Sequence, residues 1–158
     1  MNHSTIVAIS TAPGIGGIAV IRVSGSEAIL LCDQVFQPKN KSIRFADQIA
    51  NTVVFGSVVD KTEETIDDVL VSIFRAPYSF TCEDVVEISC HGSVFIQQQI
   101  LHLLIEKGCR LAMPGEFTQR AFLNGKMDLT QAEAIADLIQ AGSEAALQLA
   151  NRQLEGNF

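Results

Sequence analysis

The sequence predicts an α+β fold, in which a mixed β-sheet with flanking helices is followed by the start of an all-α domain. Runs of β-branched and apolar residues, separated by turn-forming residues, recur through roughly the first ninety residues. A helical pattern then runs to Lys107, and after Gly115 the pattern becomes helical throughout. We therefore predict a sheet domain over residues 1–117 and the beginning of a helical domain over residues 118–158.

The predicted strands are short segments rich in valine and isoleucine, bounded by glycine, proline, asparagine or clustered polar residues. The first two flank the turn-forming segment 12–17, and two later ones flank the polar segment 60–65. This arrangement is typical of neighbouring strands joined by loops. The predicted strands cover residues 5–10, 18–24, 52–59, 69–74, 85–90 and 109–112.

Two helices are predicted within the sheet domain. Ser26 is a candidate cap for a short helix that continues through Val35, where the segment 38–41 ends it and opens a loop. Ser93 is a candidate cap for a longer helix that reaches Lys107. Glycine directly after that helix fits the position at which helices commonly end in a left-handed conformation.

A short helix at residues 118–123 and a much longer helix follow the sheet domain. Thr130 and Glu133 form a capping-box pattern, and apolar residues recur at helical spacing to about Glu155, on the order of 39 Å at 1.5 Å per residue. An apolar stripe longer than its own domain is buried against another helix, another subunit or further sequence. We expect further sequence to follow.

Composition and charge exclude several classes of protein. The formal net charge is −7, and the 11 basic residues are scattered, so we do not expect the chain alone to bind nucleic acid. No segment approaches the roughly 20 apolar residues of a membrane span, and we expect a cytoplasmic protein. The cysteines form no CxxC pair and no histidine completes a zinc site, so buried free thiols without a metal are expected. They are Cys32, Cys82, Cys90 and Cys109.

The segment 14–19 matches the dinucleotide fingerprint G-x-G-x-x-A and follows a predicted strand. That motif requires a helix directly after the glycines, so that the helix N-terminus faces a pyrophosphate. The next residues, 18–24, are β-branched and predict a strand, which favours a loop between strands. A nicotinamide-binding oxidoreductase remains an alternative that requires this segment to be helical. No Walker A motif occurs in the sequence.

Charged side chains occur inside two of the predicted strands. Alternation places Arg22 on the same face as Val20, and places Glu87, Ser89 and His91 together on one face of another strand. One interpretation is an ordinary solvent-facing sheet or a structural Arg22–Glu87 ion pair. The other is a polar pocket that spans neighbouring strands. No nucleophile motif accompanies His91, so we expect no catalytic residue.

Several ordered blocks of the sequence resemble the N-terminal domain of the bacterial tRNA-modifying GTPase family MnmE, also called TrmE. The resemblance extends over nearly the whole chain. The blocks include the sequences Ile21-Arg22-Val23-Ser24-Gly25, Ser79-Phe80-Thr81, Glu83-Asp84-Val85-Val86-Glu87, Pro114-Gly115-Glu116-Phe117-Thr118 and Arg120-Ala121-Phe122-Leu123-Asn124-Gly125-Lys126.

The resemblance implies a fold related to folate-binding aminomethyltransferase domains, a homodimer, and a site for 5-formyltetrahydrofolate or a related one-carbon tetrahydrofolate. Matching the family to this sequence places the cofactor-binding residues at Arg22, Glu87 and Lys126. Their chemistry suits the ligand, because a carboxylate can accept two parallel hydrogen bonds from a pterin ring, while arginine and lysine can hold folate carbonyls or carboxylates. We expect Glu87 to hold the pterin.

For the full-length family, the resemblance implies a GTPase that binds GTP with Mg²⁺ and K⁺ in an inserted domain. With the FAD-dependent partner MnmG (GidA), it would modify carbon 5 of the wobble uridine in tRNA, using the folate one-carbon unit. This chain alone lacks the GTPase domain and is expected to be inactive. It departs from the family at Ile15, Cys82 and Met113, so a purely structural dimerisation module without folate binding remains an alternative.

Overall fold

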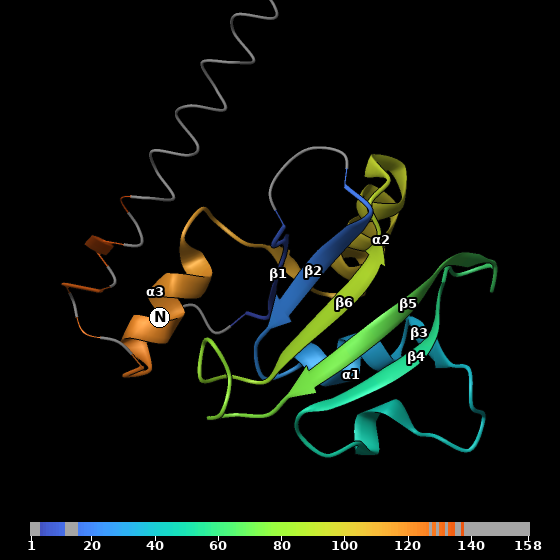
Figure 1. Cartoon of the computed structure of the whole chain (residues 1–158), viewed down its shortest axis with the longest axis horizontal. Helices are drawn as coiled ribbons and strands as arrows, with labels where there is room; N and C mark the ends of the chain where they lie inside the picture. Colours follow the sequence, from blue (N-terminus) through green and yellow to red (C-terminus); the bar gives the residue numbers. More distant parts are fainter. Residues whose placement is uncertain are drawn as a thin grey trace, which may run out of the picture.

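The computed structural model describes residues 4–11, 16–126, 128, 130–131, 133–134 and 137. This part of the chain forms one sheet of seven strands with the order β3-β4-β5-β6-β2-β1-β7 (Figure 1). The strands are β1 (Ile6–Ile9), β2 (Ile18–Ser24), β3 (Phe36–Pro38), β4 (Thr52–Val59), β5 (Thr65–Phe74), β6 (Val85–His91) and β7 (Arg110–Leu111). The helices are α1 (Ala28–Asp33), α2 (Val94–Lys107), α3 (Glu116–Leu123) and the short 3₁₀ helix η1 (Phe45–Asp47).

The sheet is mixed, as predicted: β1 and β7 are parallel, and the other neighbouring strands are antiparallel. The segment 18–24, which would be helical in a dinucleotide-binding domain, is strand β2. It pairs with β6 over its whole length. The structure therefore contradicts the nicotinamide-binding alternative, because no helix follows the glycine-rich segment.

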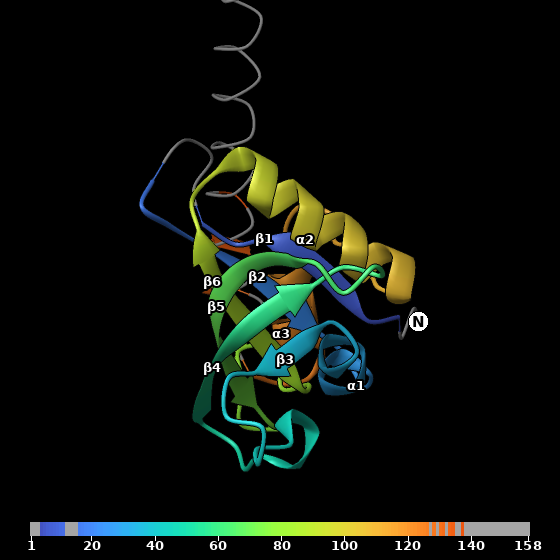
Figure 2. The ribbon, with the colours of Figure 1, turned by 90° about the vertical axis from the view of Figure 1, so that its right-hand side faces the viewer.

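Helices α1 and α2 cover one face of the sheet (Figure 2). Alternate strand residues face these helices and form the core, including the fully buried Ile21, Val71 and Ile88. Residues at the intervening positions lie on the opposite face, which we call the open face. Phe55 and Leu70 lie there, with 49% and 47% of their surface exposed. The strand alternation predicted for β2 and β6 is confirmed.

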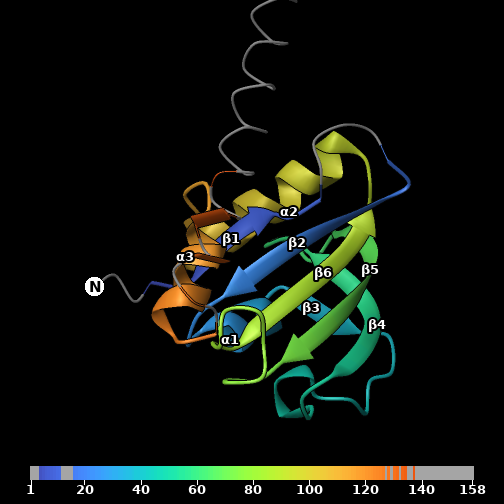
Figure 3. The same ribbon diagram turned by 60° about the vertical axis from the view of Figure 1, so that its left-hand side comes forward.

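The open face is covered at only one end. Ser24 and Val85 occupy open-face positions in paired strands, yet both are buried. The loop between β5 and β6 and helix α3 lie beside this end of the sheet (Figure 3). The next pair of open-face residues along β2 and β6 is Arg22 and Glu87, which lie directly opposite each other. The border between the covered and the uncovered part of the open face therefore falls at this pair.

The longer predicted helix is confirmed as α2. The Ser93 hydroxyl accepts a hydrogen bond from the backbone N–H of Ile96 at 3.5 Å, and Gly108 follows the helix with a φ of 126°. The predicted Ser26 cap of α1 is wrong. Glu27 precedes that helix without a side-chain cap, and its N–H donates to the hydroxyl of Thr5 instead.

Two strands differ from the prediction. Pro38 was expected to lie in a loop but belongs to β3, where it is tolerated because β3 is an edge strand. Strand β5 begins at Thr65 rather than at residue 69, because Asp67 and Asp68 are incorporated in it. The Asp67 carboxylate accepts a hydrogen bond from the backbone N–H of His91 in β6. The Asp68 carboxylate accepts one from the hydroxyl of Ser57 in β4.

The long helix predicted to reach Glu155 lies almost wholly outside the described residues. At its beginning, Asp128 and Gln131 cap each other reciprocally. The Gln131 N–H donates to the Asp128 carboxylate at 2.8 Å, and the Asp128 N–H donates to the Gln131 side chain at 3.2 Å. A capping box is therefore present, but two residues earlier than the predicted Thr130. None of the described helices combines the length and the apolarity needed to cross a membrane.

Candidate functional site

Arg22 and Glu87 form an ion pair across β2 and β6. The two residues are directly opposite in the antiparallel register, and Nε of Arg22 donates to Oε2 of Glu87 at 3.1 Å. Their side chains are 24% and 27% exposed, so the pair is neither fully buried nor fully solvated. The predicted Arg22–Glu87 contact therefore exists, at the border of the covered part of the open face.

Two phenyl rings flank the guanidinium of Arg22. Its central carbon lies 5.0 Å from the ring centroid of Phe80, in the loop between β5 and β6. The same carbon lies 5.4 Å from the ring centroid of Phe117, on α3. These are cation–π distances, and they bring Arg22 into contact with two segments that are far apart in the sequence.

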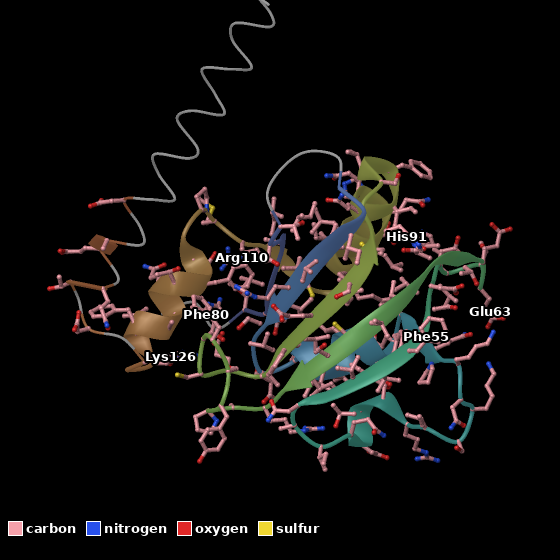
Figure 4. The ribbon with its side chains drawn as sticks, in the orientation of Figure 1. Phe55, Glu63, Phe80, His91, Arg110 and Lys126 are labelled. Carbon is pink, nitrogen blue, oxygen red and sulfur yellow. The ribbon has the colours of Figure 1, made fainter. Side chains whose placement is uncertain are left out.

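Lys126 completes the cluster from the residues that follow α3. Its Nζ donates to the backbone oxygen of Ser79 at 2.7 Å and lies 5.4 Å from the ring centroid of Phe80. Figure 4 shows Lys126 and Phe80 close together beside α3. Arg22 and Lys126 thus both lie within cation–π distance of the Phe80 ring, and Glu87 joins them through its ion pair with Arg22.

The loop that carries Phe80 is held by hydrogen bonds to β2 and α3. The Ser24 hydroxyl lies 2.6 Å from the Thr81 hydroxyl and donates to Glu83 at 2.8 Å. From the other side, the Asn124 side-chain amide donates to the backbone oxygen of Thr81 at 2.8 Å. The residues that follow Phe80 in the loop are therefore fixed to both β2 and the end of α3.

A chain of charges joins this loop to α3 and β7. Arg120, whose side chain is 7% exposed, contacts the two carboxylate oxygens of Glu83 at 3.2 and 3.3 Å and also Glu116 at 3.5 Å. Glu116 in turn accepts two hydrogen bonds from Arg110 and one from the Met113 N–H. The hydrogen bonds from Arg110 are the main cause that lowers the pKa of Glu116.

Other titratable groups lie away from the cluster. The exposed His91 is at the end of β6, where its Nδ1 lies 2.7 Å from Asp67 (Figure 4). It lies four positions along β6 from Glu87. No group of three histidine, cysteine or acidic side chains that could hold a metal occurs among the described residues. The structure therefore gives His91 a partner in β5 rather than in the cluster.

Three of the four cysteines are buried as predicted, and all are free thiols. Burial raises the pKa of Cys90 and Cys109 to about 11 and that of Cys32 well above its usual value. Cys82 is half-buried, two residues after Phe80 and directly before Glu83 in the chain, and its φ is 64°. This left-handed conformation strains a residue with a Cβ, which explains why glycine suits the position.

Two shallow hollows lie at the other edge of the sheet. They adjoin β3 and β4 and are lined mainly by polar and charged side chains, among them Gln37, Lys39 and Lys61. In the strand order they are separated from Arg22 by β5 and β6. Neither is lined by an aromatic ring, so we take the Arg22 cluster as the candidate site.

Sequence reasoning missed four residues that build the cluster. Local sequence patterns assigned no role to Phe80, Phe117, Glu83 or Arg120. The available signal was that all four lie in the blocks that resemble the MnmE family. Nothing in their local spacing showed that the β5–β6 loop would meet α3.

The arrangement is suited to bind a flat, polar aromatic molecule that carries negative charge. Arg22 uses only its Nε on protein within the described residues, so its terminal N–H groups are available for an anion or a carbonyl. Likewise, Glu87 uses only Oε2 there, and its other oxygen can accept from a ligand. The rings of Phe80 and Phe117 supply aromatic surface beside these groups for contact with an aromatic ligand.

Comparison with known proteins places this chain in a class. The family model described as GTP-binding protein TrmE N-terminus matches residues 5–126. The match covers most of the chain, which therefore belongs to this family.

Curated relatives of high similarity are proteins named tRNA modification GTPase MnmE. The one from Parabacteroides distasonis is 59% identical over 155 residues, with 98% of this chain and 34% of the relative covered. The one from Bacteroides thetaiotaomicron is 56% identical over 158 residues, with 100% and 34% covered. The one from Flavobacterium johnsoniae is 53% identical over 159 residues, with 100% and 34% covered. The chain thus spans about a third of these relatives' length and corresponds to the N-terminal part of an MnmE protein.

Proposed function

We propose that this chain binds a reduced one-carbon folate, such as 5-formyltetrahydrofolate, at the cluster of Arg22, Glu87 and Lys126. The observation that carries the proposal is the partly buried Arg22–Glu87 pair, whose guanidinium lies within cation–π distance of two phenyl rings, with hydrogen-bonding capacity left on both charged groups. Glu87 would accept hydrogen bonds from the amino group and adjacent N–H of the pterin ring. Arg22 and Lys126 would hold the carbonyls or carboxylates of the folate.

We further propose that the chain forms a homodimer through the uncovered part of the open face. Val53 and Phe55 of β4 and Leu70 of β5 expose 60%, 49% and 47% of their surface there, beside the Arg22–Glu87 row. No described helix covers them. A second copy of this chain is a suitable partner for this patch, because a twofold interface places the same patch on both sides. The patch is also self-complementary in charge, since its apolar residues lie beside one cation, Arg22, and one anion, Glu87.

In the longer protein, this part would supply the folate one-carbon unit for a change at carbon 5 of the wobble uridine in tRNA, with MnmG as partner. GTP hydrolysis, with Mg²⁺ and K⁺, would belong to a domain outside this sequence, and this chain alone would hydrolyse no GTP. The name tRNA modification GTPase, carried by the relatives, supports this placement.

Calorimetric titration of 5-formyltetrahydrofolate tests the ligand proposal. Glu87→Ala is expected to weaken binding at least about tenfold, since a hydrogen bond to a charged group contributes about 1.5–3 kcal/mol. Glu106→Gln is a matched control, because Glu106 forms an exposed ion pair with Lys61 at 3.7 Å, outside the cluster. Equal affinity of wild type and Glu87→Ala would remove Glu87 from the site.

Light scattering tests the dimer. Phe55→Glu is expected to shift the protein to monomer, whereas Phe95→Glu, on the helix-covered side and 70% exposed, is expected to leave the dimer intact. A dimer that takes up no folate would instead select the purely structural dimerisation module. The strained Cys82 is the observation that favours this second candidate, because it lies in the loop that carries Phe80.

A further inference from the structure

One ion pair joins the two segments that carry the rings around Arg22. Phe80 lies three residues before Glu83 in the β5–β6 loop, and Phe117 lies three residues before Arg120 on α3. Residues three apart on a helix lie on the same side, so Phe117 and Arg120 both point from α3 toward the sheet. The Glu83–Arg120 pair therefore spans the same gap as the two rings.

Both members of this pair are fixed by further contacts. Glu83 accepts from the Ser24 hydroxyl of β2 at 2.8 Å, which ties it to the strand that carries Arg22. Arg120 is 6% exposed and also contacts Glu116 at 3.5 Å on its own helix. With its guanidinium engaged by two carboxylates, Arg120 has little surface left for a ligand.

We propose that Glu83 and Arg120 are positioning residues of the ligand site. Their pair sets the separation of Phe80 and Phe117, and with it the orientation in which Arg22 is presented. A buried ion pair is a weak source of net stability but fixes relative geometry, because both charges must remain paired. The site needs such a constraint, since one ring comes from a loop and the other from a helix at the edge of the sheet.

The proposal rests on the proposed folate binding, and the experiment separates the two. Titration of 5-formyltetrahydrofolate would compare wild type with Glu83→Gln, which removes the charge but keeps an acceptor for Ser24, and with Arg120→Lys, which keeps the charge but loses the planar fork. Circular dichroism would establish that each variant is folded at the titration temperature. Both variants are expected to bind about tenfold more weakly, a loss within the usual range for coupled sites.

Asp84→Asn is the matched control. Asp84 is the neighbour of Glu83, and its carboxylate accepts from the Ala76 N–H at 2.9 Å, away from the rings. The affinity of the Asp84→Asn variant for 5-formyltetrahydrofolate is expected to stay within about twofold of wild type, as is usual for substitutions outside a site. An equal loss in Asp84→Asn and Glu83→Gln would mean that any change in the loop weakens binding, and would overturn the positioning role.

A double-mutant cycle separates positioning from general destabilisation. If the pair acts by placing the ring of Phe117, then Glu83→Gln is expected to cost little further affinity in a Phe117→Leu background. Fully additive losses would overturn the inference. Unchanged affinity in Glu83→Gln would overturn it while leaving folate binding in place, whereas a wild type that binds no folate would remove both.

Discussion

Replacing Glu116 with glutamine is expected to lower the stability of the chain and to flatten its dependence on pH. The side chain of Glu116 is 10% exposed, and its oxygens accept from Arg110 at 3.0 and 2.5 Å and from the Met113 N–H at 2.8 Å. Hydrogen bonds to charged groups contribute about 1.5–3 kcal/mol. Because the side chain of Arg110 is 34% exposed and solvated, and glutamine keeps one acceptor, we expect a loss of about 2 kcal/mol at pH 7.

The sign of the pH effect follows from the pKa of Glu116, which lies below its ordinary value of 4.5, chiefly because of the hydrogen bonds from Arg110. The unfolded chain therefore binds a proton at a pH at which the folded chain does not. The stabilisation is complete above the unfolded pKa of 4.5 and is lost as pH falls below it toward the folded pKa. Glu116→Gln has no such group to titrate, so the two stability curves should converge as the solution is acidified.

Urea unfolding followed by far-UV circular dichroism, at several pH values between 7 and 3, measures both effects. Glu106→Gln serves as the control, since its exposed pair with Lys61 is expected to contribute less than about 1 kcal/mol. Asp60 also has a lowered pKa and adds to the pH dependence of every variant, so the difference between wild type and Glu116→Gln is the informative quantity. Parallel pH curves for these two proteins would refute the reasoning.

The remaining predictions concern strain, thiol reactivity and strand packing. Cys82→Gly is expected to raise stability by about 1 kcal/mol in thermal unfolding, because it relieves a left-handed φ of 64°; an unchanged or lower melting temperature would contradict this. A thiol reagent at pH 8 is expected to label Cys82 in the native protein but the buried Cys32, Cys90 and Cys109 only after denaturation, because burial raises the pKa of the latter three. Rapid labelling of all four in the native protein would be the opposing result. Gly56→Ala is expected to destabilise by about 1–3 kcal/mol in urea unfolding, since its Cβ would lie 2.2 Å from a backbone oxygen of β3. A loss below the error of the measurement would show that β3 moves aside freely.

The sequence predicted most of the fold because strands and helices leave periodic patterns in the chain. Strand β4 has the predicted bounds, Thr52–Val59, and α2 ends at the predicted Lys107. The short strand β3 was missed because it contains a proline, which only its edge position allows. The start of β5 was missed because acidic residues there resemble a loop until their partners in neighbouring strands are known.

The site was predictable only in part. Strand alternation showed that Arg22 and Glu87 are charged residues inside otherwise apolar strands. It did not show that β2 and β6 are neighbours in the sheet, because the two residues are 65 positions apart in the sequence. Lys126 was identified only through the family resemblance, since a lysine after a helix is ordinarily solvated. The pairing of β2 with β6 and the contact of Lys126 with the β5–β6 loop join segments far apart in the sequence, and local residue spacing does not predict such contacts.

The position of the cluster couples the ligand to α3. Phe117 and Arg120 belong to α3, and Lys126 is held at its end by a hydrogen bond from its N–H to the Ala121 oxygen at 2.9 Å. A ligand that contacted Arg22 and Lys126 together, as proposed above, would therefore favour the position of α3 seen here over any other. By linkage, whatever holds α3 in this position strengthens ligand binding by the same free energy.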